Sequence, residues 1–150
     1  MMRAAVVALI LLIGSSATAK VYDDKFDLKN VASIGVELVD NADGACWTNL
    51  KEAREYAEEK LRMRGAKIDN DGVPTANNYS FAINVLGQRL FKNGTGPCFG
   101  NVSVELFTFG YFNGNFHAIS AGAHYEAVLH NENLNRYVIR AIKEFIAEFK

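Results

Sequence analysis

The chain has little of what marks several protein classes. Its 150 residues include only 2 Pro and 2 Cys, and 17 acidic residues nearly balance 16 basic ones, for a formal net charge of −1. Collagen-like, low-complexity and disulfide-dense chains need far more Gly, Pro or Cys. A disordered chain needs a larger net charge and fewer apolar residues than the 49% found here. Because single domains usually contain about 100–150 residues, the composition indicates one globular domain.

The charged residues also lack the basic cluster that nucleic-acid binding requires. Between positions 51 and 64 they alternate in sign, and Lys51–Glu55 and Glu58–Arg62 have the i, i+4 spacing of helical ion pairs. We interpret this segment as a solvent-exposed helix face and expect no nucleic-acid partner.

The first nineteen residues have the three-part layout of a secretory signal peptide. A basic start at Arg3 precedes an apolar run at 4–13, and Ala17-Thr18-Ala19 matches the A-x-A cleavage pattern. The run is shorter than the about 20 apolar residues that span a bilayer, and a buried core helix is the alternative. We therefore expect a signal peptide over 1–19 and one domain over 20–150. The mature protein is expected in the periplasm or outside the cell, with no transmembrane segment.

Export bears on the two cysteines, because an oxidising compartment favours a disulfide. Cys46 and Cys98 can pair in only one way, and we predict that they do. The alternative is two free, buried thiols. Without a CxxC motif or a nearby His, the pair is weak evidence for metal or redox chemistry.

Hydropathy periodicity predicts six elements in the order β-α-β-β-β-α. The strands alternate apolar and polar residues, and the helices show apolar residues every three or four positions. The resulting architecture is a two-layer α+β sandwich, with a mostly antiparallel sheet and both helices on one of its faces. The predicted strands cover 31–39, 79–85, 102–112 and 115–129, and the predicted helices cover 46–64 and 134–149.

The dipeptide Asn113-Gly114 predicts a tight hairpin, because both residues tolerate the positive φ of a two-residue turn. A uniform register from this turn places Tyr111 opposite Phe116 and, farther away, Val104 opposite Ala123. The face that contains Val104 is aliphatic, so we assign it to the helices.

The opposite face of this hairpin holds four aromatic residues, and a two-layer sandwich leaves that face in water. Exposed apolar patches of this size mark interaction surfaces, so we predict binding of an unknown protein partner or self-association, through this face or through a sheet edge. In one alternative, residues 20–28 fold back and cover the patch with Phe26 and Leu28. In the other, a β-bulge reverses the faces beyond it. The four residues are Phe107, Phe109, Tyr111 and Phe116.

In the uniform register, Glu105, His124 and Glu126 share that same face, farther from the turn. Imidazole and carboxylate groups are metal and acid–base ligands, so a small-ligand site, a hydrolase or a metal site is the alternative hypothesis. The signal is weak, and we assign no metal ligands and no cofactor.

Recognisable catalytic motifs are missing from the sequence. It contains no G-x-S-x-G or G-x-x-x-x-G-K-[ST] pattern, and its acidic loops do not match a calcium-binding loop. Asn78, Asn93 and Asn101 begin glycosylation sequons, which matter only in a eukaryotic source. We therefore predict a small exported interaction or accessory module, and an enzyme only as the alternative.

Overall fold

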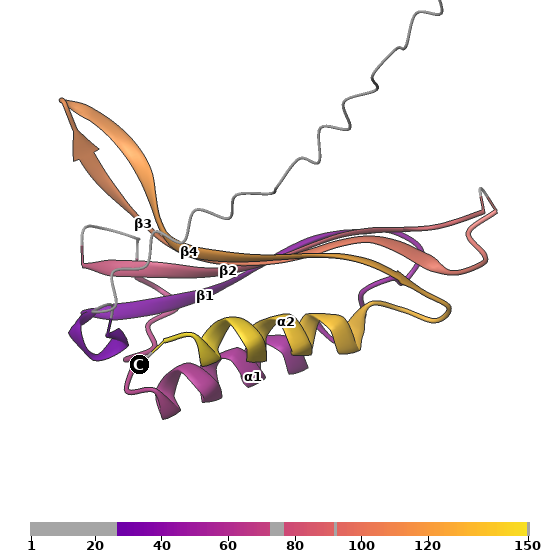
Figure 1. The fold of residues 1–150 in the computed structure, drawn as a ribbon, viewed down its shortest axis with the longest axis horizontal. Coiled ribbons are helices and arrows are strands. Elements are labelled where there is room, and N and C mark those ends of the chain that lie inside the picture. Colours follow the sequence, from indigo (N-terminus) through magenta and orange to yellow (C-terminus); the bar gives the residue numbers. More distant parts are fainter. Residues whose placement is uncertain (1–26, 73–76, 92, 150) are drawn as a thin grey trace, which may run out of the picture.

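The computed structural model describes residues 27–72, 77–91 and 93–149. A short 3-10 turn, η1, precedes four strands and two helices, and their order confirms the predicted β-α-β-β-β-α sequence of elements (Figure 1). The elements are η1 (Leu28–Asn30), β1 (Ser33–Ala42), α1 (Leu50–Met63), β2 (Asn78–Arg89), β3 (Cys98–Phe112), β4 (Asn115–His130) and α2 (Asn135–Ala147).

The strands form one mixed sheet in the order β1-β2-β3-β4. β1 and β2 run parallel, which requires a crossover connection, and α1 lies in that connection. The other two pairs are antiparallel. Both helices lie on the same side of the sheet, so the predicted two-layer α+β sandwich is confirmed (Figure 1). We call the covered side the helix face and the other side the outer face.

The hydrophobic core fills the space between the helix face and the two helices. Alternate residues of β2 and β3 are fully buried there, and the Phe81 ring of β2 lies 5.8 Å from the Phe145 ring of α2. The alternation follows from the strand period of two, which sends every second side chain to the same face. The fully buried β3 residues on this face are Val102, Val104 and Leu106.

The predicted disulfide between Cys46 and Cys98 is present, with an S–S distance of 1.99 Å. It explains why α1 begins at Leu50 and not at Cys46. Gly44 and Ala45 both have positive φ, and the bond ties the next residue to the start of β3, so the chain enters the helix only afterwards. Trp47 is nevertheless buried, as its place in the apolar pattern predicts.

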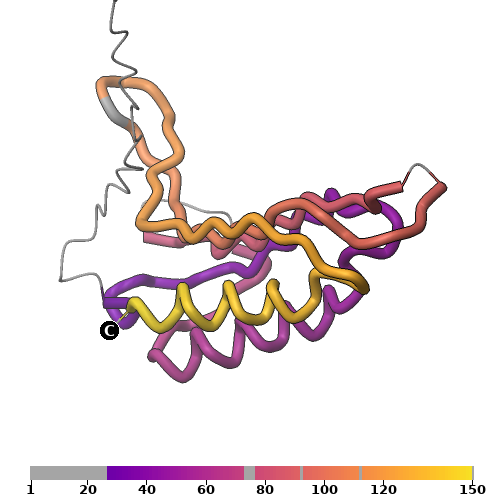
Figure 2. Tube along the Cα trace, turned by 45° about the vertical axis from the view of Figure 1, so that its right-hand side comes forward, coloured from indigo at the N-terminus to yellow at the C-terminus, as the bar shows by residue number. Residues whose placement is uncertain are grey.

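The end of the β3–β4 hairpin projects beyond the four-stranded part of the sheet. The last β2–β3 pair toward the turn joins Ser80 to Phe107, and from there to the turn only β3 and β4 remain paired. This two-stranded extension, residues 107–120, is called the arm below. It turns away from the helices, toward the side of the outer face (Figures 1 and 2).

Candidate interaction surface

The turn at the tip of the arm is the one that the sequence predicts. Asn113 and Gly114 have φ values of 49° and 78°, and Phe112 pairs with Asn115 across a two-residue loop. Positive φ at both loop residues is the signature of a type I′ turn, which matches the twist of a β-hairpin. The predicted pairing of Tyr111 with Phe116 is confirmed, and Phe109 pairs with Ala118 in the same uniform register.

Four aromatic side chains stack along the outer face of the arm, and we call them the aromatic ladder: Phe107, Phe109, Tyr111 and Phe116. The ring centroids of Phe107 and Phe109 are 5.5 Å apart, and Phe109 stacks on Phe116 at 5.1 Å. Tyr111 meets Phe116 edge-on at 5.4 Å. These are favourable geometries for aromatic pairs. The ladder is thus an ordered surface, in which each ring supports the next.

The aromatic ladder is open to solvent at its outer end. Tyr111 is 79% exposed and Phe116 is 59% exposed, whereas Phe107 and Phe109 are half-buried by their neighbours in the ladder. The described N-terminal residues do not cover it. Leu28 is fully buried in the core between the sheet and the helices, which rules it out as a cover for the arm. Phe26, the other residue of that alternative, lies outside the described residues.

Below the arm, the uniform register is wrong. Phe107 still pairs with Ser120, but Leu106 pairs with Gly122, so Ala121 is an extra, unpaired residue. This is a β-bulge, the second alternative considered for the sequence. Val104 therefore lies opposite His124 and not opposite Ala123.

The bulge corrects the predicted positions of two candidate site residues. His124 and Glu126 lie on the helix face, because they pair with the core residues Val104 and Val102. Glu105 stays on the outer face, opposite Ala123. The hypothesis that Glu105, His124 and Glu126 share one face is therefore wrong.

On the helix face, both residues meet charged groups of α2. Glu126 forms an ion pair with Arg140, and His124 Nε2 lies 3.8 Å from a carboxylate oxygen of Glu144. These contacts join the edge strand to the helix and leave Glu126 only 20% exposed. No three His, Cys, Asp or Glu side chains gather into a metal-binding group within 27–72, 77–91 and 93–149.

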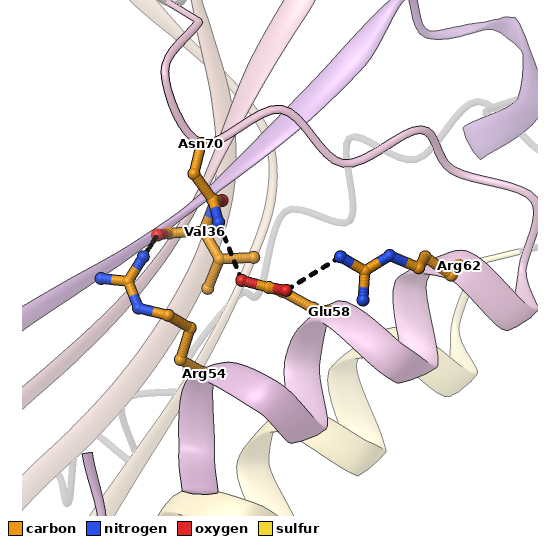
Figure 3. A network of polar contacts seen from close by, with 5 residues as sticks. All are labelled: Val36, Arg54, Glu58, Arg62 and Asn70. Atoms are coloured by element: carbon orange, nitrogen blue, oxygen red, sulfur yellow. Dashed lines mark hydrogen bonds and ion pairs between the residues drawn. The ribbon is translucent and has the colours of Figure 1, made fainter. Parts of the chain in front are cut away.

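The two edges of the sheet differ in how they are protected. On the β1 edge, the backbone N–H of Ile34 donates to the Lys67 carbonyl, and that of Val36 donates to Asn70 Oδ1 at 2.9 Å. Arg54 Nη1 donates to the Val36 carbonyl at 2.9 Å (Figure 3). The outward backbone groups of Ile34 and Val36, in the first half of β1, are thus occupied by the chain itself.

A second layer of contacts holds these protecting groups in place. Asn70 Nδ2 donates to Glu58 Oε1 at 2.8 Å, and the other oxygen of Glu58 accepts from Arg62 at 2.9 Å (Figure 3). Both charged residues come from α1, one turn apart. The pair predicted from its i, i+4 spacing therefore helps to hold Asn70 against the β1 edge.

The β4 edge has no such cover along residues 115–123, as far as the described part of the chain shows. The whole segment 106–125 contains no Asp, Glu, Lys or Arg, although charged residues are the usual protection of a free edge. Sequence reasoning found the aromatic ladder and named a sheet edge as the alternative surface, but it did not identify β4 as that edge. The missing charge was the signal that could have revealed it.

The disulfide indicates an exported protein, since such bonds persist in oxidising compartments. The predicted signal peptide, residues 1–19, lies outside the described residues. Neither α1 nor α2, the helices of the described part, is long and apolar enough to cross a membrane.

Comparison with known proteins does not assign this chain to a family. No protein-family model matches this chain, and no curated protein sequence does. Among solved structures, the chain has a weak likeness to a minor lipoprotein from Acinetobacter baumannii. The match covers 77% of this chain and 85% of the other, with 12% sequence identity and a TM-score of 0.36. A likeness at this level says nothing about the function of the present chain.

Proposed function

We propose that this protein is an exported, non-catalytic interaction module that binds a protein partner through the aromatic ladder of its arm. The observation that supports the proposal is the position of the ladder: ordered rings on a two-stranded extension, outside the core and open to water. Its place of action is the periplasm or the exterior of the cell.

The energetics of the arm favour a binding role. A two-stranded ribbon without further strands or a helix is only marginally stable in water. Exposed rings at its end add little to the fold, whereas each ring that a partner fully buries contributes about 1.5–3 kcal/mol. Aromatic side chains in such positions are common binding hot spots. The ladder is therefore better explained by a bound partner than by folding of the monomer.

The enzyme alternative has less support. His124 and Glu126 are held by α2 and are separated from Glu105 by the sheet itself. An acid–base or metal site built from these three residues would need them on one face.

The proposal is tested by site-specific photocrosslinking. A photoreactive phenylalanine analogue at Tyr111 is expected to capture a discrete protein partner in the native cell envelope or secretion fraction. The same analogue at Met63, which is 71% exposed on α1, serves as the control and is expected to capture nothing discrete. Equal capture at both positions would contradict the proposal.

A pair of double variants separates binding from folding. With the photoreactive analogue kept at Tyr111, Phe109→Ser with Phe116→Ser removes the stacked pair at the centre of the ladder. This variant is expected to abolish the crosslinked complex while the melting temperature stays close to that of the wild type. The matched control, Leu86→Ser with Leu129→Ser, removes two exposed apolar residues from the sheet body and is expected to keep the complex. Unfolding of the first variant would show that the ladder belongs to the core.

A further inference from the structure

The backbone of the arm presents hydrogen-bonding groups to the open β4 edge. In a hairpin with a two-residue loop, the flanking residues form a hydrogen-bonded pair, and such pairs alternate with non-hydrogen-bonded pairs along the ladder. Because Phe112 and Asn115 flank the loop, the N–H and C=O groups of Phe116, Ala118 and Ser120 point away from β3. These three residues form the free edge of the arm.

Side-chain size leaves this edge accessible. The residues that follow Phe116 on the outer face of β4 are Ala118 and Ser120, which stand beside the larger Phe109 and Phe107 of β3. The outer face of the edge strand β4 therefore carries small side chains beside the half-buried rings of β3. An incoming strand can reach the backbone there, and a large side chain on that strand would rest against the aromatic ladder.

The free edge is complementary to itself. In an antiparallel pairing about a two-fold axis at Ala118, Phe116 of one copy lies opposite Ser120 of the other, and Ala118 faces Ala118. Each bulky ring thus meets a small residue, next to Phe107 of the second copy. The outward groups of the three residues on each copy would form about six main-chain hydrogen bonds.

Charge does not oppose this pairing. A two-fold axis brings identical residues near one another, so a charged edge would repel its copy. The segment 106–125 contains no Asp, Glu, Lys or Arg. The β1 edge is different at Ile34 and Val36, since other parts of the same chain occupy the outward backbone groups of these two residues (Figure 3).

We propose that two copies of this chain form a two-fold dimer in which the β4 edges of their arms pair antiparallel about Ala118. The proposal rests on the proposed function, and it names the partner as a second copy. The two ladders then form one aromatic surface across a continuous four-stranded sheet. Since the paired segment is short, the interface lies at the small end of specific interfaces and dissociates on dilution.

Sedimentation equilibrium of the purified protein tests the pairing, over about 1 µM to 1 mM, the range in which a small interface dissociates. The wild type is expected to shift from one chain to two. Ala118→Pro removes the central outward N–H, which an edge strand tolerates because β3 does not use it, and is expected to raise the dissociation constant at least tenfold. Ala118→Thr keeps that N–H and is expected to dimerise.

A second measurement locates the axis. Opposed residues of a hydrogen-bonded antiparallel pair have Cα atoms about 5.5 Å apart, which is within disulfide range. Ala118→Cys is therefore expected to form a disulfide-linked dimer in air. Ala127→Cys, an exposed position farther along β4, is expected to remain monomeric.

The outcomes separate the two proposals. A wild type that stays monomeric over the whole range, or an Ala118→Pro variant that dimerises like Ala118→Thr, overturns the pairing. A monomer whose arm binds anionic phospholipid vesicles also overturns it. If the monomer still gives a discrete crosslink to another protein from Tyr111, the proposed function stands. If no crosslink to any protein forms, the proposed function fails as well.

Discussion

Arg140 of α2 forms an ion pair with Glu126 of β4, and this contact joins the edge strand to the helical layer. The Arg140 guanidinium also lies 4.7 Å from the ring centroid of Tyr137. Glu126 is 20% exposed, and its second oxygen has no hydrogen-bond partner among the described residues. The stability of β4 therefore depends on Arg140 more than on a typical surface cation.

We predict that Arg140→Ala lowers the free energy of unfolding by about 1–2 kcal/mol, because it leaves a mostly buried carboxylate unpaired. Urea denaturation measures the change. Arg136→Ala is the control, since Arg136 also lies over the Tyr137 ring, at 4.9 Å, without an ion pair to Glu126. A loss of equal size in both variants would assign the effect to the aromatic contact.

The bulge at Ala121 gives a second prediction, about the direction of the arm. Ser120 faces outward and Gly122 faces the helices, so deleting the residue between them restores a regular ladder without moving any side chain to the other face. The protein is expected to fold, but the arm should straighten, because bulges bend the strand that contains them.

Pulsed electron spin resonance measures this change, with spin labels on the arm tip at Asn113 and on α2 at Lys143. The arm turns away from the helices in the wild type, so the deletion is expected to shorten the distance between the labels (Figure 1). Ala121→Gly keeps the residue count and is expected to keep the wild-type distance. An unchanged distance in the deletion variant would mean that the bulge does not set the bend.

The element order and the covered face of the sheet could be predicted from the sequence, and the bulge could not. Apolar periodicity over strands and helices is a strong signal, and Asn113-Gly114 determined the register near the turn. Between Ser120 and Ala123, however, every residue is small, and small residues fit either face of a sheet. The alternation of apolar and polar residues therefore does not show where the extra residue of the bulge is inserted.

The candidate site residues could likewise be placed from the sequence on one side of the bulge and not on the other. The aromatic ladder lies between the turn and the bulge, where counting from the turn holds, so its rings could be placed on one face. His124 and Glu126 lie beyond the bulge, and the same count put them on the wrong face. The protection of the β1 edge depends on Asn70 meeting Val36, a contact between distant positions that periodicity does not reveal.

The disulfide gives a third prediction. Cys46 and Cys98 are 52 residues apart, and the loop-entropy model predicts that a bond of this span stabilises the fold by about 4 kcal/mol. Measured stabilisation by disulfides is often smaller than this model predicts. Cys46→Ser with Cys98→Ser is expected to lower the free energy of unfolding by about 2–4 kcal/mol. Cys98 begins β3 and the arm ends it, so crosslinking from Tyr111 is expected to persist below the melting temperature. Loss of the crosslink in folded protein would show that the bond also shapes the arm.

The last prediction concerns the protected β1 edge. Asn70→Ala removes the acceptor for the Val36 N–H and the donor to Glu58, and Arg54→Met removes the donor to the Val36 carbonyl. The double variant frees both outward backbone groups of Val36 on a second edge of the sheet, and exposed edges promote strand pairing between molecules. Light scattering is expected to show assemblies larger than a dimer. Lys51→Ala, which removes only the exposed ion pair with Glu55 on the same helix, is the control and is expected to assemble like the wild type. If the double variant also assembles like the wild type, the Asn70 and Arg54 contacts stabilise the fold without limiting association to β4.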